Sequence, residues 1–305
     1  MAIFQQLKKI IHPRYIFYWL LLLFLYPFTF LPKRLQICFG YIFGFIAITV
    51  SKSRRKIVKI NLKLCFSELN EKELADLYRK FVVSLGLGFI ETAIAWFRGE
   101  KYLRKISRLE ADAKSLEFIN NPEQAVVLVG SHSTLLELGV RLLGIYVPSA
   151  GMYRPLKNPF FEEWIKFQRA RAATELVHFK DMRKVVKILQ KGENIWYALD
   201  QDMGRKTGVY ADFFGRKACS VNILPKLAKI ADIQTIPVFI WREKNSYVVK
   251  ILPAISPEIT ANSDAIEVMQ KVNSVIEKEV RAQPEQYFWV HRRFKNPADG
   301  DEYPY

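Results

Sequence analysis

The sequence predicts an α/β protein with a mixed, largely parallel sheet flanked by helices, preceded by an N-terminal membrane-anchoring helical segment. Two observations support this fold class. Beyond about residue 123, short runs rich in β-branched and aromatic residues alternate with stretches of helical periodicity. Before that, the first 67 residues contain eleven Lys and Arg, no Asp or Glu, and two long uncharged apolar stretches. We therefore divide the chain into an apolar, polybasic anchor (1–67) and a second unit (68–305), with a helical lead-in at 68–120 and an α/β core at 121–305.

The composition excludes several classes of protein. The 305 residues are 50% hydrophobic, which is too apolar for a disordered chain and sufficient for one large core or two small ones. The three cysteines, Cys38, Cys65 and Cys219, are far apart and form no CxxC pair. They argue against a disulfide framework and a zinc site, and they indicate a reduced, cytosol-facing protein. The net charge of +16 predicts an anionic partner, which could be nucleic acid, a membrane surface or an acidic substrate.

The N-terminal apolar stretches predict attachment to a membrane. Tyr15 to Pro32 is eighteen residues long without a charge, and Leu35 to Val50 is a second uncharged run. At about 1.5 Å per helical residue, the first run is just long enough to cross a hydrocarbon core of about 30 Å. It is rich in aromatic residues and lacks a small-residue cleavage site, so we expect it to be retained. A single span, a helix pair dipping into one leaflet, and two buried core helices all remain open.

A polybasic stretch follows the apolar runs. Its basic residues are Lys52, Arg54, Arg55, Lys56, Lys59 and Lys63. Beside an apolar segment, such a stretch is best placed against lipid phosphates. Nucleic acid is the weaker interpretation, because neither zinc-finger spacing nor an RNP-like aromatic motif accompanies the charge.

The rest of the chain has the pattern of an α/β sheet. Helical periodicity covers Glu71 to Phe97. Four strands are predicted: Ala125–Gly130, Asn194–Leu199, Thr235–Trp241 and Ser246–Leu252. Four further helices are predicted: Pro159–Ala173, Asp181–Lys191, Ser220–Ala231 and Asn262–Gln283. There is no Gly-rich phosphate loop, so nothing supports a nucleotide-dependent mechanism.

His132 is the strongest candidate for chemistry. It follows the apolar strand that ends at Gly130, and Glu137 lies one turn into the next helix. Ligands of α/β sheets bind beyond the carboxyl ends of strands. There, an imidazole can deprotonate a hydroxyl, and a carboxylate on its other nitrogen would fix the tautomer. The pair is sufficient for moving an acyl group onto an alcohol.

Other interpretations compete with this one. Thr134-x-x-Glu137 is also a capping box, in which Glu137 would only close a helix start, and the histidine would be structural. Ser131 and Ser133 flank His132, but without a GxSxG elbow a covalent serine route is disfavoured. We expect no metal, because the histidines have no matched spacing.

The motif HSTLLE, an HxxxxE element, resembles the catalytic box of the late acyltransferases of lipid A biosynthesis. Four further segments occur in the family's order: RRKIVKINLKLCFSEL (54–69), GMYRPLKNP (151–159), KGENIWYALDQDMG (191–204) and PEQYFWVHRRFK (284–295). The resemblance covers nearly the whole chain. It implies a glycerophosphate-acyltransferase-like fold, because the two families are related.

The resemblance also implies a reaction. A fatty acyl chain would move from acyl carrier protein to a hydroxyl of a 3-hydroxyacyl chain of Kdo2-lipid IVA, without a covalent enzyme intermediate. His132 would be the general base and Glu137 its orienting partner. The site would lie at the cytoplasmic face of a bacterial inner membrane, among phospholipids, and would need no cofactor beyond the acyl-ACP donor. LELG after the box leans towards a lauroyl rather than a myristoyl transferase.

Three arginines are candidates for binding the oxyanion or the anionic substrate. Arg154 lies in the family's GMYRP block, and Arg169 and Arg171 lie on the following predicted helix. Each could stabilise the tetrahedral oxyanion, or bind sugar phosphates or Kdo carboxylates bidentately. A solvated helix face is the alternative for Arg169 and Arg171.

Two further blocks resemble the family. Asp200 and Asp202 fit its D-x-D block, with Leu199 where proline is common, and would position phosphate or sugar groups through basic partners. The HRR run contains His291, Arg292 and Arg293, which we interpret as substrate-binding or structural, with structural favoured for this run.

One predicted helix carries a basic face that bears on the partners of the protein. Lys184, Lys187 and Lys191 share one face of a predicted helix, which could dock the acidic carrier protein or could simply be solvated. We expect a monomer and no nucleic-acid partner. Two other functions stay open: acylation of another polar lipid, such as a phosphatidylinositol mannoside, and a non-catalytic lipid-binding protein.

Overall fold

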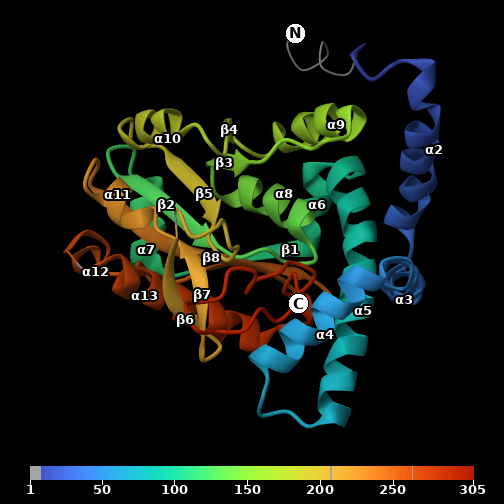
Figure 1. Cartoon of the computed structure of the whole chain (residues 1–305). Helices are drawn as coiled ribbons and strands as arrows, with labels where there is room; N and C mark the ends of the chain where they lie inside the picture. The colour runs from blue at the N-terminus through green and yellow to red at the C-terminus, as the bar shows by residue number, and fades with distance from the viewer. Residues whose placement is uncertain (1–7, 207, 263) are drawn as a thin grey trace.

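A computed structural model of the chain describes residues 8–206, 208–262 and 264–305. The first seven residues of the predicted anchor and residue 263 of the predicted helix Asn262–Gln283 lie outside the described residues. Figure 1 shows a sheet with helices around it, and the N-terminal helices gathered along one side of this body.

The helices begin and end as follows. The α-helices are α2 (Ile16–Leu25), α3 (Lys33–Val50), α4 (Lys52–Cys65), α5 (Glu71–Phe97), α6 (Glu100–Ile106), α7 (Ala113–Asn120), α8 (Leu136–Tyr146), α9 (Pro159–Arg169), α10 (Met182–Leu189), α11 (Leu224–Ala228), α12 (Pro257–Asn262) and α13 (Ala265–Ala282). The 3₁₀ helices are η1 (Pro13–Tyr15), η2 (Tyr26–Phe30) and η3 (Pro284–Gln286).

The strands are shorter than the helices. They are β1 (Ser107–Ala111), β2 (Ala125–Gly130), β3 (Ala150–Tyr153), β4 (Leu176–His178), β5 (Asn194–Ala198), β6 (Gly208–Phe213), β7 (Arg216–Val221), β8 (Ile233–Arg242) and β9 (Tyr247–Ile251).

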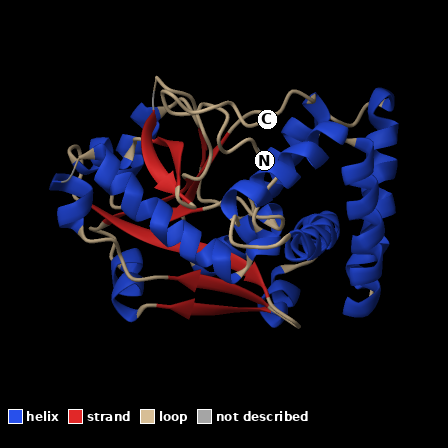
Figure 2. Cartoon of the chain, turned by 60° about the horizontal axis from the view of Figure 1, so that its bottom comes forward, coloured by secondary structure: helices blue, strands red, loops and turns tan. Residues whose placement is uncertain are grey.

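Seven strands form one sheet in the order β1-β9-β8-β2-β5-β3-β4. Only β8 and β9 pair antiparallel in this sheet, and its other neighbouring pairs among the described residues are parallel. A separate antiparallel hairpin is formed by β6 and β7. The predicted mixed, largely parallel sheet is therefore confirmed, and Figure 2 shows helices packed around much of it, with two strands along the lower edge of the view.

Both faces of the sheet are covered by apolar side chains. Along β2, Val127 and Val129 belong to one buried cluster, while Val126 and Leu128 belong to the other. This alternation follows from the two-residue period of a strand. All six residues of β2 are buried, which is typical of a strand at the centre of a parallel sheet.

The four predicted strands are present as β2, β5, β8 and β9, but the other five strands of the described residues were not predicted. The predicted helix Ser220–Ala231 is partly wrong, because Ser220 and Val221 pair with β6 as the end of β7. Helix α11 begins only at Leu224, with Pro225 in its first turn, where proline's missing N–H has no helical partner to lose.

The first apolar run does not form one long helix. Helix α2 has 10 residues, which corresponds to a length of about 15 Å, or about half of a hydrocarbon core. Pro27 then occupies the first turn of η2 and ends the regular helix. The alternative of a single transmembrane helix formed by this run alone is therefore wrong. Among the described residues, two helices are long and apolar enough to cross a membrane: α3, and α5, most of which is buried inside the protein.

Helix α3 packs closely against α5 at glycines. A Cβ on Gly44 would lie 1.9 Å from the carbonyl oxygen of Val82, and one on Gly86 would lie 1.7 Å from that of Gly40. Gly40 and Gly44 form a GxxxG pair, which lets helix backbones approach each other. The opposite side of α3 leaves large apolar side chains exposed: Ile37, Tyr41, Ile42, Phe45 and Ile46.

Candidate active site

The loop between β2 and α8 (131–135) holds His132 and is fixed by the C-terminal segment. Ser133 forms an antiparallel bridge with Tyr287. The Thr134 amide donates to the Gln286 carbonyl at 2.8 Å, and the Phe288 amide donates to the His132 carbonyl at 3.2 Å. The residues after η3 thus act as a short partner strand for this loop, which we call the catalytic loop.

His132 is paired with Asp200. The imidazole Nδ1 lies 2.7 Å from Asp200 Oδ1, and the His132 backbone amide donates to Asp200 Oδ2 at 3.1 Å. The pairing follows from strand register: Gly130 lies opposite Ala198 on the neighbouring parallel strand, and each side chain comes two residues later. With the Asp200 carboxylate accepting from Nδ1–H, the lone pair of Nε2 is free to take a proton.

Asp200 is held as a carboxylate. It is 2% exposed, and burial alone would raise its pKa, but the neighbouring His132 charge, two hydrogen bonds from His132 and one from Tyr287 lower the pKa to about 2. Burial, and then the Asp200 charge, raise the pKa of Tyr287, so the phenol keeps its proton and donates it. A buried anion beside the imidazole stabilises an imidazolium.

Glu137 is not the partner of His132. Its carboxylate pairs with the Arg169 guanidinium through Nη2–Oε1 and through Nε–Oε2 at 3.4 Å. The predicted His132–Glu137 pair is therefore wrong, because the register of β2 and β5 places Asp200 at Nδ1, and Glu137 contacts Arg169 instead. The capping box is also not observed: Leu135 is the N-cap residue of α8, and its side chain makes no capping hydrogen bond.

His132 opens onto a cleft that also contains two of the three candidate arginines. A cavity of about 200 Å³ is lined by His132, Arg154 and Arg169, together with apolar Leu136, Val140, Leu176 and Trp196. A second cavity, of about 120 Å³, shares His132, Arg154 and Trp196 and continues past Phe179 and Met203. A base and guanidinium groups therefore face a largely apolar cleft, which is an arrangement suited to a lipid and a developing oxyanion.

A sequence profile described as bacterial lipid A biosynthesis acyltransferase matches residues 3–296. The chain belongs to this family.

Relatives named for lipid A biosynthesis give the same family over nearly their whole lengths. This lipid A acyltransferase is 32% identical to the lipid A biosynthesis lauroyltransferase of Escherichia coli K12, with 95% of each chain covered. It is 33% identical to the lipid A biosynthesis palmitoleoyltransferase of the same organism, with 96% of each chain covered. In structure, it resembles the 1-acyl-sn-glycerophosphate acyltransferase of Thermotoga maritima at 15% identity and a TM-score of 0.41, covering 83% of this chain and 98% of the other. The family assignment confirms the resemblance and makes the protein an acyltransferase of lipid A biosynthesis, which excludes the non-catalytic alternative.

Other predicted residues of the lipid A acyltransferase lie away from the cleft. Arg171 donates to the Trp96 carbonyl and to the Gln168 side chain, and it lines neither cavity beside His132. Asp202 is 1% exposed and accepts from the amide and side chain of Asn296, so it fastens the C-terminal segment. The prediction that Asp200 and Asp202 position sugar groups through basic partners is therefore wrong for this structure, because both carboxylates are buried and used internally.

The three residues of the HRR run also have different surroundings. His291 lies beside the His132–Asp200 pair, and burial lowers its pKa to about 4. Arg293 is 2% exposed and donates to the Cys219 carbonyl and the Ser220 hydroxyl, which is a structural role. Arg292 is exposed and contacts Tyr303 near the C-terminus.

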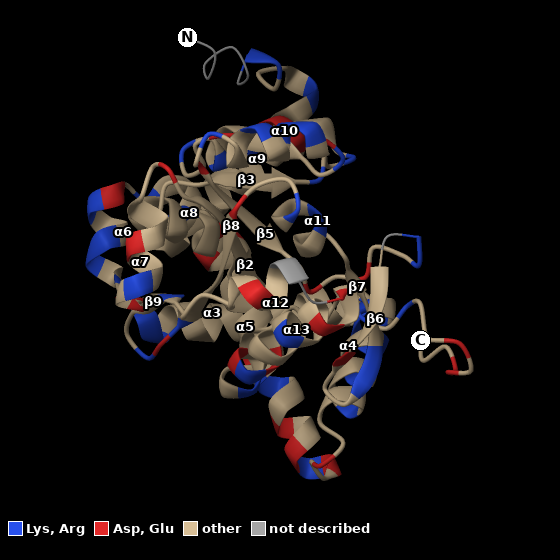
Figure 3. Cartoon of the chain, turned by 90° about the vertical axis from the view of Figure 1, so that its left-hand side faces the viewer, with Lys and Arg blue, Asp and Glu red and all other residues tan. Residues whose placement is uncertain are grey.

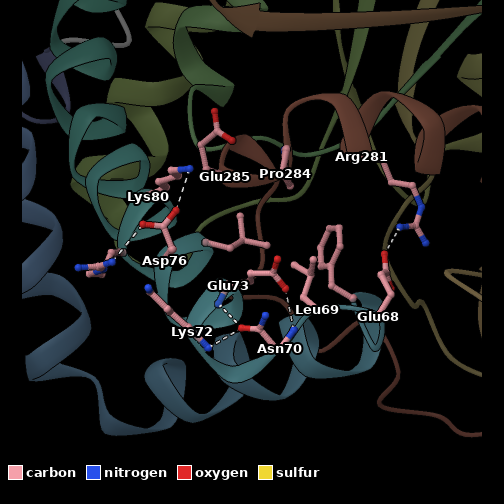
Figure 4. A pocket seen from close by; sticks show the side chains of 13 residues that line it. Glu68, Leu69, Asn70, Lys72, Glu73, Asp76, Lys80, Arg281, Pro284 and Glu285 are labelled. Carbon is pink, nitrogen blue, oxygen red and sulfur yellow. Dashed lines mark hydrogen bonds and ion pairs between the residues drawn. The ribbon is translucent and has the colours of Figure 1, made fainter.

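A larger cavity than the two beside His132 lies elsewhere in the lipid A acyltransferase. It has a volume of about 760 Å³ and is formed where α4 turns into α5 (Figure 4). Its charged side chains are largely paired with each other, as in Arg281–Glu68 and Asp76–Lys80. None of its lining residues is a predicted site residue, so size does not identify the site.

The sequence did not reveal Asp200 as the partner of His132, nor Tyr287 and Gln286 as supports of the catalytic loop. One signal was present for Asp200: like His132, it comes two residues after a buried strand. The basic face predicted on α10 is partly used internally, because Lys184 pairs with Glu175, whereas Lys187 and Lys191 are exposed. Figure 3 shows the Lys and Arg of α10 at the top of the view.

Proposed function

We propose that this lipid A acyltransferase moves a fatty acyl chain, of lauroyl or myristoyl type, from acyl-ACP onto a hydroxyl of a 3-hydroxyacyl chain of Kdo2-lipid IVA. The observation that carries the proposal is the His132–Asp200 pair, which opens onto a cleft also lined by Arg169. A thioester donor suits this site, because direct attack on a thioester needs one base and a group that stabilises an oxyanion.

The first step forms the tetrahedral intermediate. Nε2 of His132 takes the proton of the acceptor hydroxyl as its oxygen bonds to the thioester carbonyl carbon. The carbonyl π electrons move to oxygen and form the oxyanion. Asp200 stays ionised throughout and stabilises the imidazolium through Nδ1–H.

Arg169 is the proposed stabiliser of that oxyanion. Its guanidinium lines the cleft with His132 and is held in place by the carboxylate of Glu137. A donor fixed before the reaction needs no reorganisation when charge develops. Glu137 thus orients an arginine rather than the histidine, and Arg154, at the more exposed side of the cleft, is left to bind anionic groups of either substrate.

The second step releases the carrier. The oxyanion re-forms the carbonyl, the carbon–sulfur bond breaks, and the thiolate of the carrier's prosthetic group takes the proton from the His132 imidazolium. The products are an ester on the lipid and a free thiol. No covalent enzyme intermediate is needed, and the imidazole returns to its neutral state.

The proposed location is the cytoplasmic face of the inner membrane. Large apolar side chains are exposed on α2 and α3, which adjoin the polybasic α4; those on α2 are Ile16, Phe17, Leu20, Leu21, Leu23 and Phe24. Helix α2 is also tied to the α/β part, because Asn158 donates to the Tyr18 hydroxyl at 2.9 Å and Trp19 packs on Phe160. We infer that α2 and α3 enter one leaflet as a pair, which keeps the cleft near the lipid substrate.

The test is transfer of labelled lauroyl or myristoyl groups from acyl-ACP to Kdo2-lipid IVA by membranes that contain the protein. His132→Ala should reduce turnover by about 100-fold or more, since removal of a general base forfeits roughly 10²–10⁴-fold. Normal turnover by that variant would overturn the mechanism. A phosphatidylinositol mannoside, offered as the acceptor in the same assay, tests the other open substrate class.

The preferred acyl chain length can be determined by comparing donors in that assay. The relatives named for lauroyl and palmitoleoyl transfer are 32% and 33% identical to this chain, so identity favours neither. An apolar pocket separates chains that differ by one methylene by only about 1–3 kcal/mol. A series of acyl-ACP donors from ten to sixteen carbons, compared by kcat/KM, would show the preference.

A further inference from the structure

A second buried ion pair lies on the far side of the catalytic loop from Asp200. Glu91 on α5 and Arg242 at the end of β8 form a bidentate pair, with both nitrogen–oxygen distances at 2.6 Å. The side chain of Glu91 is 1% exposed and that of Arg242 is 9% exposed. The Tyr247 hydroxyl donates to the same carboxylate at 2.8 Å.

The third nitrogen of the Arg242 guanidinium points towards the catalytic loop. Arg242 Nη1 donates to the Ser84 hydroxyl at 3.1 Å, and that hydroxyl lies 2.8 Å from the Thr134 hydroxyl. Thr134 is two residues from His132. We call Glu91, Arg242, Ser84 and Thr134 the buried polar chain; it runs from α5 to the loop that carries the general base.

One face of α5 is shaped for this contact. Ser84, Gly88 and Glu91 are four and three residues apart, so they share a side of the helix. A Cβ on Gly88 would lie 2.1 Å from the Thr134 carbonyl oxygen, which means that the helix backbone lies directly against the loop. The loop therefore meets a hydroxyl and a bare backbone from α5, and that hydroxyl is held by the guanidinium of Arg242 from β8.

Gln286 links the same arginine to the loop by a second route. Its side chain accepts from the Arg242 amide at 2.7 Å and donates to the Arg242 carbonyl at 2.8 Å. Its own carbonyl accepts from the Thr134 amide at 2.8 Å. Both the backbone and the side chain of Arg242 thus converge on Thr134.

Stability alone does not account for a buried charge pair. Removing two charges from water costs several kcal/mol per ion, and apolar residues of similar volume are often neutral or stabilising replacements. What an apolar replacement cannot supply is a fixed direction for the Ser84 and Thr134 hydroxyls. Directional contacts matter here because a displacement of about 1 Å at a catalytic group can cost about 100-fold in rate.

We propose that Arg242 is a positioning residue, which holds His132 in its reactive place through Ser84, Thr134 and Gln286. Its effect on turnover rests on the proposed acyl transfer, whereas its effect on the loop does not. The experiment therefore measures both properties in the full-length protein in membranes or detergent.

The first arm measures turnover. Ser84→Ala and Thr134→Val remove the link between Arg242 and the loop without adding a charge, and each should lower kcat by about tenfold, the equivalent of one well-placed hydrogen bond. KM for acyl-ACP and for the lipid should stay within about twofold. Thr134→Ser restores the hydroxyl and should recover most of the rate, whereas the double variant Ser84→Ala/Thr134→Val should be no slower than the worse single variant.

The second arm measures the loop directly, by hydrogen exchange of the peptide covering 129–137. Ser84→Ala and Thr134→Val should raise exchange in that peptide while distant peptides stay unchanged. The matched control is Glu279→Gln, which breaks another buried pair: Glu279 binds Lys250 at 2.7 Å and Trp241 at 3.2 Å. It should lower the thermal midpoint without changing exchange of the catalytic loop.

The outcomes separate the two proposals. If wild-type protein transfers no acyl group from acyl-ACP, the proposed function fails, and loop exchange alone decides the positioning role. Wild-type exchange in Ser84→Ala and Thr134→Val would overturn that role. The positioning role would also be overturned if Glu279→Gln raised exchange of the loop as much as Ser84→Ala and Thr134→Val do. The same holds if exchange of the loop rose in those two variants while kcat stayed unchanged.

Discussion

At the scale of the residue, two buried aspartates in one short segment do different work. Asp200 contacts the imidazole of His132, whereas Asp202 contacts Asn296 and the Gly204 amide. Asp200→Asn should therefore reduce kcat by about 100-fold or more, because the neutral amide no longer stabilises the imidazolium. Asp202→Asn is the matched control and should lower thermal stability while the folded protein keeps near-normal kcat. Initial rates of labelled acyl transfer and thermal melts measure the two effects, and equal kcat losses in both variants would contradict the assignment.

His291 makes the stability of the folded protein depend on pH. Burial lowers its pKa from 6.5 to about 4 in the folded protein. The unfolded chain therefore takes up a proton at higher pH than the folded one does, so this group destabilises the fold progressively as pH falls from about 6.5 towards 4. The thermal midpoint of the wild type should fall over that range more than that of His291→Gln. Parallel melting curves for the two proteins would contradict the prediction.

The residues of the site were only partly predictable. His132 was predicted as the candidate base because it follows a buried strand within a family-like motif, and both features are local in sequence. Asp200 is 68 positions away, and its pairing depends on β2 and β5 being neighbours. Single-strand patterns do not specify strand order, so Glu137, the nearer carboxylate, was assigned wrongly. Tyr287 and Gln286 escaped for the same reason, since their contacts are set by how the C-terminal segment returns to the loop.

At the scale of the element, the backbone of helix α5 lies against the catalytic loop at Gly88. Gly88→Ala would place a methyl group 2.1 Å from the Thr134 carbonyl oxygen, a backbone atom that cannot rotate away. We expect a loss of about 1–3 kcal/mol in stability and at least about a tenfold loss in kcat, because either the helix or the loop must move. Gly99→Ala is the control, since its Cβ would meet nothing within 4 Å. Thermal melts and turnover of both variants provide the measurement, and a Gly88→Ala protein with wild-type kcat would contradict it.

The more apolar a strand is, the more accurately its bounds were predicted from the sequence. The predicted strand Ala125–Gly130 matches β2 residue for residue, because its six buried residues leave no polar position to obscure it. Strand β1 has no buried residue and β4 has three residues in all, so neither stands out from a loop in sequence. Hairpin β6–β7 was missed because its strands carry polar residues, such as Asp212 and Lys217, opposite each other. The missed strands therefore include both sheet edges, the hairpin and β3, a four-residue strand next to one edge whose residues line the cleft with His132.

At the scale of the whole molecule, the positive charge and the apolar surface are placed together. Residues 1–67 contribute eleven of the 46 Lys and Arg and no acidic residue, and helices α2 and α3 leave large apolar side chains exposed. Apolar surface beside a basic helix is the combination that binds anionic bilayers. The same surface would be a liability on a protein that stays in water.

This arrangement predicts where a single charge will release the protein from membranes. Ile46 on α3 and Ile230 after α11 are each 52% exposed, so they differ in location and not in exposure. Ile46→Glu should reduce partitioning onto vesicles of inner-membrane composition by about tenfold or more, because a carboxylate in the hydrocarbon region costs on the order of 2–3 kcal/mol. Ile230→Glu should leave partitioning unchanged. Vesicle sedimentation at matched protein concentration measures both, with circular dichroism to confirm folding. If Ile230→Glu also detaches the protein, the bilayer contacts a wider surface than α2 and α3. If Ile46→Glu sediments like the wild type, α3 does not enter the membrane.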